Sequence, residues 1–325
     1  MINRLKDHGL LTLLLVVFLA LAIRMPTLWF LPQASVLLKP GMLAWLVSAV
    51  NQWPVVSVVT STIMVISLAL MINEMVRSHN MMRPVGYLPA FFFVLLQSIY
   101  RENMLLTEYH FGNFFIFLGL ILLLRLRDGY STVLLFYSAM AFGIAILIVP
   151  DHLLILLFIL SCVLVFKTIV IRDVLAIVFG LVLPYYVLRS LIFINDWDVT
   201  TVSNITTTPI NIDGFGQGVA GVFTRYSVYL AFFTVAVFGL MKVSGNYFSD
   251  NVEVRRSKLV VILFFIYSLL LLALHFRELK SFHLLTAFPA AILIAYFFTG
   301  EKRHWWKELM GWGLLLALVT TLYLV

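Results

Sequence analysis

Long apolar runs alternate with short polar stretches along nearly the whole chain. A helix that crosses a membrane needs roughly 20 apolar residues, and it satisfies its backbone hydrogen bonds internally. The pattern predicts eleven spans, at about 9–31, 55–76, 85–100, 111–125, 131–150, 152–167, 174–194, 226–242, 259–275, 283–299 and 308–325. We therefore predict an all-α fold, a polytopic transmembrane helical bundle that forms one integral membrane domain over residues 1–325.

The stretch 32–54 departs from this pattern. Three prolines and Gly41 surround an amphipathic run at 43–53. A short amphipathic run of this kind is typical of a helix that lies in the plane of the membrane interface. We predict an interfacial or re-entrant helix near 43–53.

The composition leads to the same class of protein. Of the 325 residues, 62% are hydrophobic and 11% are charged, whereas soluble domains are about half apolar and a quarter charged. The formal net charge of +7 comes from short loops between apolar runs, so no nucleic-acid partner is expected. The single cysteine, Cys162, excludes an intramolecular disulfide and a cysteine-based zinc site.

The basic residues divide into two groups once the N-terminus is placed in the cytoplasm. Loops on the cytoplasmic side then hold 15 of the 22 Lys and Arg residues. Because cytoplasmic loops carry the excess of these residues, the division favours a cytoplasmic N-terminus. The outer side holds the other seven, which are Arg24, Lys39, Arg101, Arg189, Arg225, Arg277 and Lys280.

The outer basic residues have acidic and histidine neighbours, and Arg24 and Arg189 lie within apolar spans. Arginine presents a planar fork of donors that suits phosphate oxygens. One hypothesis is a site for an anionic lipid headgroup, such as polyprenyl phosphate. Its candidate substrate-binding residues are Arg24, Arg101, Arg189, Arg225, Arg277 and Lys280, and its candidate catalytic bases are Glu102, Glu108 and His152. The alternative is that these residues pair with one another and reach toward lipid headgroups.

A glycine-rich stretch and four histidines are two further candidates for chemistry. The glycine-rich stretch 214–221 could let the backbone approach an anion, or it could be a flexible loop that enters a span. His110, His152, His275 and His283 lack the spacing that places two metal ligands on one helix face. No nucleotide loop or hydrolase motif is recognisable, so we expect no cofactor and no metal.

Several stretches together resemble one known family. They are Tyr87 to Phe91, Asn113 to Leu118, Ile121 to Arg127, Ile177 to Tyr186 followed by Asn195 to Asp198, and His283 to Phe298 followed by Trp305 to Glu308. The chain resembles, from about residue 85 onward, an uncharacterised family of multi-pass inner-membrane proteins from Gram-negative bacteria, gliding species included. The resemblance implies a bacterial inner (cytoplasmic) membrane and supplies no catalytic residues. The layout is also similar to that of envelope-glycan polymerases and ligases, at the level of architecture alone.

Three functions stay open at this point. The first is an enzyme or carrier that acts on a polyprenyl-phosphate-linked glycan at the outer leaflet. The second is a non-enzymatic membrane subunit of an envelope complex for secretion, motility or assembly, with 28 phenylalanines available for helix packing against protein partners. The third is a transporter, for which internal repeats would be expected.

Overall fold

A computed structural model describes residues 5, 9–28, 42–82, 86–127, 129–166, 170–194, 219–274, 279–299 and 305–323. Within these ranges the chain forms twelve α-helices and no strand. Their bounds are Leu10–Arg24 (α2), Ala44–Asn51 (α3), Pro54–Ser78 (α4), Leu88–Gln97 (α5), Glu108–Leu124 (α6), Thr132–Ile148 (α7), Ile155–Phe166 (α8), Ile171–Ile194 (α9), Val219–Gly245 (α11), Val252–Leu274 (α12), Leu279–Phe298 (α13) and Trp305–Tyr323 (α14). Short 3-10 helices include Arg101–Met104 (η3) and Pro150–Leu154 (η5).

The predicted all-α fold is confirmed, and each predicted apolar range overlaps one of these helices. Among the described residues, five helices are long and apolar enough to cross a membrane: Pro54–Ser78, Glu108–Arg127, Ile171–Ile194, Val228–Gly245 and Val252–Leu274. Apolar helices of 10–17 residues are Leu10–Arg24, Leu88–Gln97, Thr132–Ile148, Pro150–Phe166 and His283–Phe298. The five long helices indicate a membrane protein.

Several helix ends differ from the predicted spans. α2 ends at Arg24 rather than at 31, α11 begins at Val219 rather than at 226, and α12 begins at Val252 rather than at 259. Hydropathy detects the apolar part of a helix and misses polar turns at its ends, because long polar side chains there can reach water. The first two turns of α12, which carry three basic residues, are therefore helix rather than loop.

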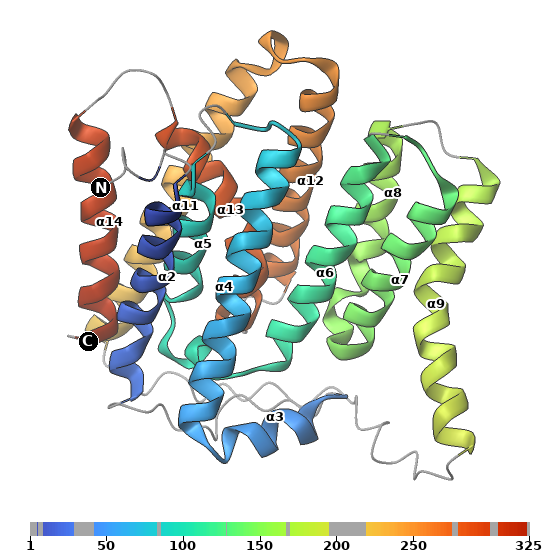
Figure 1. The fold of residues 1–325 in the computed structure, drawn as a ribbon, viewed down its shortest axis with the longest axis horizontal. Helices are drawn as coiled ribbons and strands as arrows, with labels where there is room; N and C mark the ends of the chain where they lie inside the picture. Colours follow the sequence, from blue (N-terminus) through green and yellow to red (C-terminus); the bar gives the residue numbers. More distant parts are fainter. Residues whose placement is uncertain are drawn as a thin grey trace.

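The eleven helices other than α3 run alternately between two ends of a bundle (Figure 1). We call one end the basic end. There α4, α6, α8, α11 and α13 terminate, and α2, α5, α7, α9, α12 and α14 begin. We call the opposite end the α3 end, because α3 lies across it (Figure 1). A helix is present where one was predicted near 43–53, as α3, and its interfacial or re-entrant placement stays a prediction. The exposed Trp45 and Trp53 flank its buried Val47.

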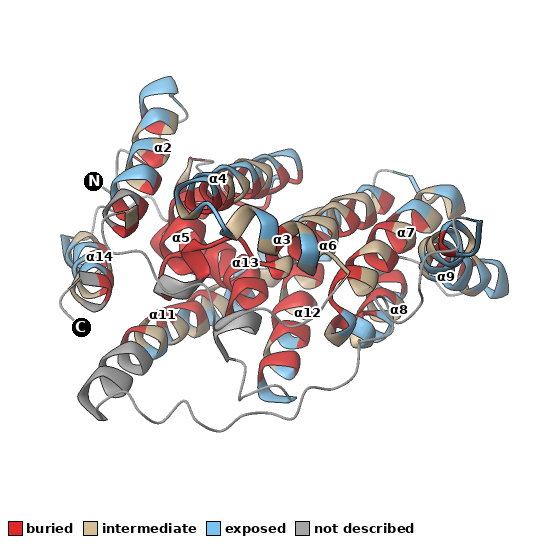
Figure 2. Ribbon diagram, turned by 90° about the horizontal axis from the view of Figure 1, so that it is seen from below, coloured by how far each residue is buried: buried red, intermediate tan, exposed pale blue. Residues whose placement is uncertain are grey.

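The centre of the bundle is formed by α5 and α13. Every residue of α5 is buried, as is nearly all of α13 from His283 onward (Figure 2). By contrast, only 17% of the apolar stretch of α9 is buried, and α9 lies at one edge, where it packs on α7 (Figures 1 and 2). A Cβ atom at Gly180 would lie 2.7 Å from Cβ of Ala139, so this glycine allows the two helices to approach closely.

Candidate functional site

The last residue of α2, Arg24, is fully buried at the α3 end, with 1% of its surface exposed. Its Nη1 donates a hydrogen bond to Oγ of Ser61 on α4 at 3.0 Å. The Ser61 hydroxyl in turn donates to the carbonyl oxygen of Met104 in η3. Nε and Nη2 of Arg24 have no hydrogen-bond partner among the described residues. Burying a charged donor without an acceptor costs about 1–3 kcal/mol or more, so these two groups call for an acceptor.

The position of the His110 ring is set by the N-terminal cap of α6. Thr107 is the N-cap residue of α6, and it forms a capping box with His110. Nδ1 of the buried His110 ring accepts a hydrogen bond from the backbone N–H of Thr107 at 3.3 Å, and the Thr107 hydroxyl lies 2.8 Å from the same atom. The ring is close enough to Arg24 for the two groups to interact electrostatically. The capping geometry therefore holds an imidazole within electrostatic range of the buried cation.

A second set of polar groups holds the surroundings of Arg24 in place. Oγ of Ser57 donates to Oδ1 of Asn51 at 2.5 Å and accepts from the backbone N–H of Leu106 at 2.8 Å. The Asn51 amide closes the ring by donating to the Leu106 carbonyl at 3.2 Å. These bonds join α3, α4 and the segment before α6. They hold these three segments together and do not involve Nε or Nη2 of Arg24.

Three other predicted site residues make contacts of their own. Glu108 begins α6, half-buried, and its carboxylate accepts a hydrogen bond from the backbone N–H of Leu43. His152 is fully buried in η5, with its ring packed against Tyr109 at 6.4 Å between centroids. Arg189 lies exposed on α9, where its Nε donates to the Tyr185 hydroxyl at 3.0 Å. In both overall views α9 and α2 lie at opposite sides of the bundle (Figures 1 and 2).

The remaining predicted site residues fall outside the described part of the chain, wholly or in their side chains. Arg277 and most of the glycine-rich stretch, 214–218, lie outside the described residues. Helical backbone is described at Arg101 and Glu102 in η3, at Arg225 in α11 and at Lys280 in α13, and their side chains are not described. Their roles stay predictions.

The sequence interpretation missed Ser61, which contacts the buried cation, and Ser57, one helical turn before it. Ser57 and Ser61 are spaced i, i+4, so a single face of α4 presents both hydroxyls toward the α3 end. That spacing was the available signal. It was weak, because small hydroxyl residues are common in membrane helices and often bond to their own backbone.

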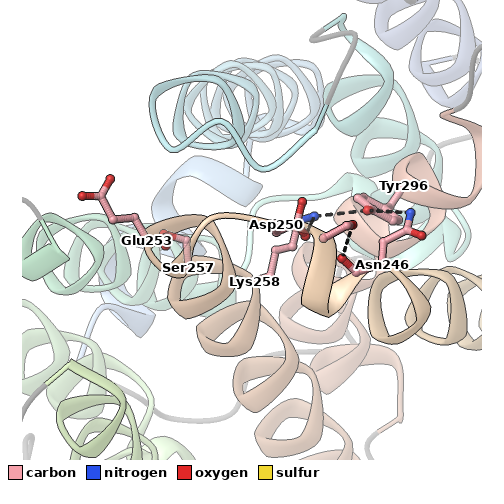
Figure 3. A network of polar contacts seen from close by, with 7 residues as sticks. Asn246, Asp250, Glu253, Ser257, Lys258 and Tyr296 are labelled. Carbon is pink, nitrogen blue, oxygen red and sulfur yellow. Dashed lines mark hydrogen bonds and ion pairs between the residues drawn. The ribbon is translucent and has the colours of Figure 1, made fainter.

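Charged side chains at the basic end are arranged differently (Figure 3). Nζ of Lys258 lies 2.5 Å from Oδ2 of Asp250 and donates to the Tyr296 hydroxyl at 3.1 Å. Lys242 donates to the Tyr296 carbonyl at 3.0 Å and to the Thr299 carbonyl. These carbonyls end α13, where the helix dipole favours a cation. An adjoining cavity beside Met81 and Val261 has room for about one water molecule. This network is a structural clamp, in which both ammonium groups have hydrogen-bond partners within the protein.

The described residues hold no group of three or more His, Cys, Asp or Glu side chains that could bind a metal ion. The three described histidines of the α3 end each have different neighbours. His110 bonds to Thr107, His152 packs on Tyr109, and Nε2 of His283 lies 2.6 Å from the Leu96 carbonyl. The three rings therefore form no common cluster within the described part of the chain.

A family model described as a family of unknown function (DUF6427) matches residues 33–324. The chain belongs to DUF6427. The predicted membership of an uncharacterised family is confirmed in this form. Ser61, His110 and His283 lie within the range matched to DUF6427, whereas α2 with Arg24 precedes it. No curated protein and no solved structure matches the chain.

Proposed function

We propose that this chain is a multi-pass inner-membrane protein that binds the phosphate of a polyprenyl-linked glycan at the outer leaflet. The observation that carries the proposal is the buried Arg24, whose Nε and Nη2 have no hydrogen-bond partner among the described residues. Two adjacent N–H donors on a planar cation match two oxygens of a phosphate group.

The sequence around Arg24 argues for an external counter-ion. Between Asp7 and Glu74 the chain contains no other Asp or Glu. This stretch includes all of α2, which carries Arg24, and most of α4, which carries its partner Ser61. A buried arginine in a membrane protein marks a functional site by default. An anionic headgroup would supply the charge that these helices lack.

The proposed topology has eleven spans and a cytoplasmic N-terminus. It is supported by the sorting of charge, because nine described basic residues of the predicted cytoplasmic group lie at the basic end: Arg77, Arg125, Arg127, Arg172, Lys242, Arg255, Arg256, Lys258 and Lys307. Since Lys and Arg mark the cytoplasmic side, the α3 end faces outward. The shorter helices would be accommodated by local thinning of the bilayer, and the exposed Trp45 and Trp53 would anchor α3 at the outer interface.

The test is binding of polyprenyl phosphate to the purified, delipidated full-length protein, measured by native mass spectrometry. Arg24→Met should bind the lipid at least about 10-fold more weakly, because two charge-assisted hydrogen bonds are lost. Arg24→Lys should be intermediate, since it keeps the charge and loses the fork. Lys258→Met, at the basic end, is the matched control and should bind as the wild type does. Wild-type binding by Arg24→Met would refute the proposal.

The alternative function is a non-enzymatic membrane subunit of an envelope complex. The observation that favours it is α9, with only 17% of its apolar stretch buried. Phe179 and Phe193 are exposed on this helix, and a helix of a partner protein could cover them in place of lipid. Photocrosslinkers at these two positions should then recover one protein partner at constant stoichiometry from native membranes. Crosslinks to lipid alone would remove this alternative.

A further inference from the structure

The imidazole of His283 presents one nitrogen whose bonding is fixed and one whose bonding is open. The ring is fully buried at the start of α13, with 1% of the residue exposed. Its Nε2 lies 2.6 Å from the carbonyl oxygen of Leu96 at the end of α5. A carbonyl only accepts hydrogen bonds, so Nε2 carries the proton, and Nδ1 of the neutral ring is an acceptor. Nδ1 has no hydrogen-bond partner among the described residues.

The neighbours of His283 hold the ring in this orientation. Tyr100 and Tyr229 approach it edge-on, with ring centroids 5.3 Å and 5.0 Å away. Nε2 of Gln97 donates to the Leu284 carbonyl at 2.8 Å, so a second bond ties the end of α5 to the start of α13. An imidazole held by a carbonyl on one side and two aromatic rings cannot turn to exchange its nitrogens. Nδ1 is thus a fixed acceptor.

One short segment connects His283 with the buried arginine. Tyr100 packs on His283, and four residues later the Met104 carbonyl accepts from Ser61, the partner of Arg24. η3 contacts both α4 and α13. Since a 3-10 helix rises about 2 Å per residue, the backbone positions of Tyr100 and Met104 are about 8 Å apart. Open donors therefore flank one end of the segment, and an open acceptor flanks the other.

We propose that Nδ1 of His283 accepts a hydrogen bond from a hydroxyl group of the same ligand whose phosphate Arg24 binds. This inference rests on the proposed function and adds a ligand class, a phosphate ester that also carries a hydroxyl group. Two lipids have this chemistry, a polyprenyl-phosphate sugar and phosphatidylglycerol. Polyprenyl phosphate without a sugar would use Arg24 alone.

Two substitutions of the same residue separate the open acceptor from the structural bond. In His283→Gln, the amide can still donate to the Leu96 carbonyl, and no acceptor replaces Nδ1. In His283→Asn, the amide oxygen can replace Nδ1, and the bond to Leu96 is lost. The probes are polyprenyl phosphate, polyprenyl-phosphate glucose, phosphatidic acid and phosphatidylglycerol, each added to the delipidated full-length protein and measured by native mass spectrometry.

His283→Gln should bind one hydroxyl-bearing lipid about 2- to 10-fold more weakly, as expected for one hydrogen bond, and should bind its hydroxyl-free counterpart as the wild type does. His283→Asn should keep the preference for the hydroxyl-bearing lipid. A loss confined to polyprenyl-phosphate glucose identifies the sugar as the donor, and a loss confined to phosphatidylglycerol identifies the glycerol.

Wild-type binding of every lipid by His283→Gln would overturn this inference, as would an equal loss for all four lipids. Arg24→Met, measured in the same series, separates this failure from failure of the proposed function. If Arg24→Met weakens binding while His283→Gln changes nothing, the phosphate site stands and the hydroxyl contact does not. If Arg24→Met also binds as the wild type does, both fail.

Discussion

Two buried cations at opposite ends of the bundle have opposite surroundings. Lys258, 6% exposed at the basic end, contacts a carboxylate and a phenol, and Lys242 beside it contacts the carbonyls that end α13. Arg24, 1% exposed at the α3 end, has one partner, Ser61, and two donors without a partner among the described residues. The cost of burying a charge is offset within the protein at one end. At the other it is left for a ligand to offset.

The largest effect should come from breaking the pair at the basic end. Asp250→Ala leaves the Lys258 ammonium buried beside Tyr296 without its carboxylate. Breaking a buried ion pair costs about 3–5 kcal/mol, and we expect about 2 kcal/mol because the Asp250 side chain is 23% exposed. Thermal unfolding in detergent measures the loss. In Asp250→Ala with Lys258→Met the loss should be largely recovered, and an equal loss in the double variant would mean that the pair is not the clamp.

Removing the cation at the α3 end should have a smaller effect of opposite sign. Arg24→Met removes two buried donors without a described partner, so the delipidated protein should gain about 1 kcal/mol in unfolding free energy. Added polyprenyl phosphate should stabilise the wild type by mass action and leave Arg24→Met unchanged. Thermal unfolding with and without lipid gives both numbers. Destabilisation of delipidated Arg24→Met by more than about 2 kcal/mol would show that the arginine is structural.

The smallest effect should come from the serine between Arg24 and η3. Ser61→Ala removes the acceptor of Nη1 and the donor to the Met104 carbonyl. We expect lipid binding to weaken about 2- to 5-fold, because the guanidinium loses orientation and keeps its charge. Ser67→Ala, on an exposed turn of the same helix, is the control, since its hydroxyl bonds only to the Ile63 carbonyl. A loss as large as that of Arg24→Met would contradict this ranking.

The helices could be predicted from the sequence, because apolar length decides where a membrane helix forms. The polar turns at their ends could not, as α11 and α12 illustrate. The site could be predicted only in part. Arg24 and Arg189 have the same sequence signal, an arginine within an apolar span, yet one is buried against α4 and the other is exposed on α9. Helix packing distinguishes them, and hydropathy carries no information about it.

His283 shows the same limit from the other side. In the sequence it is one of several histidines near a predicted span end, weighed as a metal ligand and as a member of the charged outer face. Its tautomer depends on the Leu96 carbonyl, which lies 187 residues away in the chain. A contact between residues so distant in sequence depends on the fold, and no local sequence pattern predicts it.

That separation has a consequence for biogenesis. The two bonds between the end of α5 and the start of α13 join residues 187 positions apart, so the central pair of helices cannot meet until most of the chain has been synthesised. Helices made earlier, such as α7 and α9, can pair soon after they emerge. A chain truncated before α13 would therefore contain Arg24 and most of the helices and would lack His283. The site can therefore form only after α13 has been synthesised.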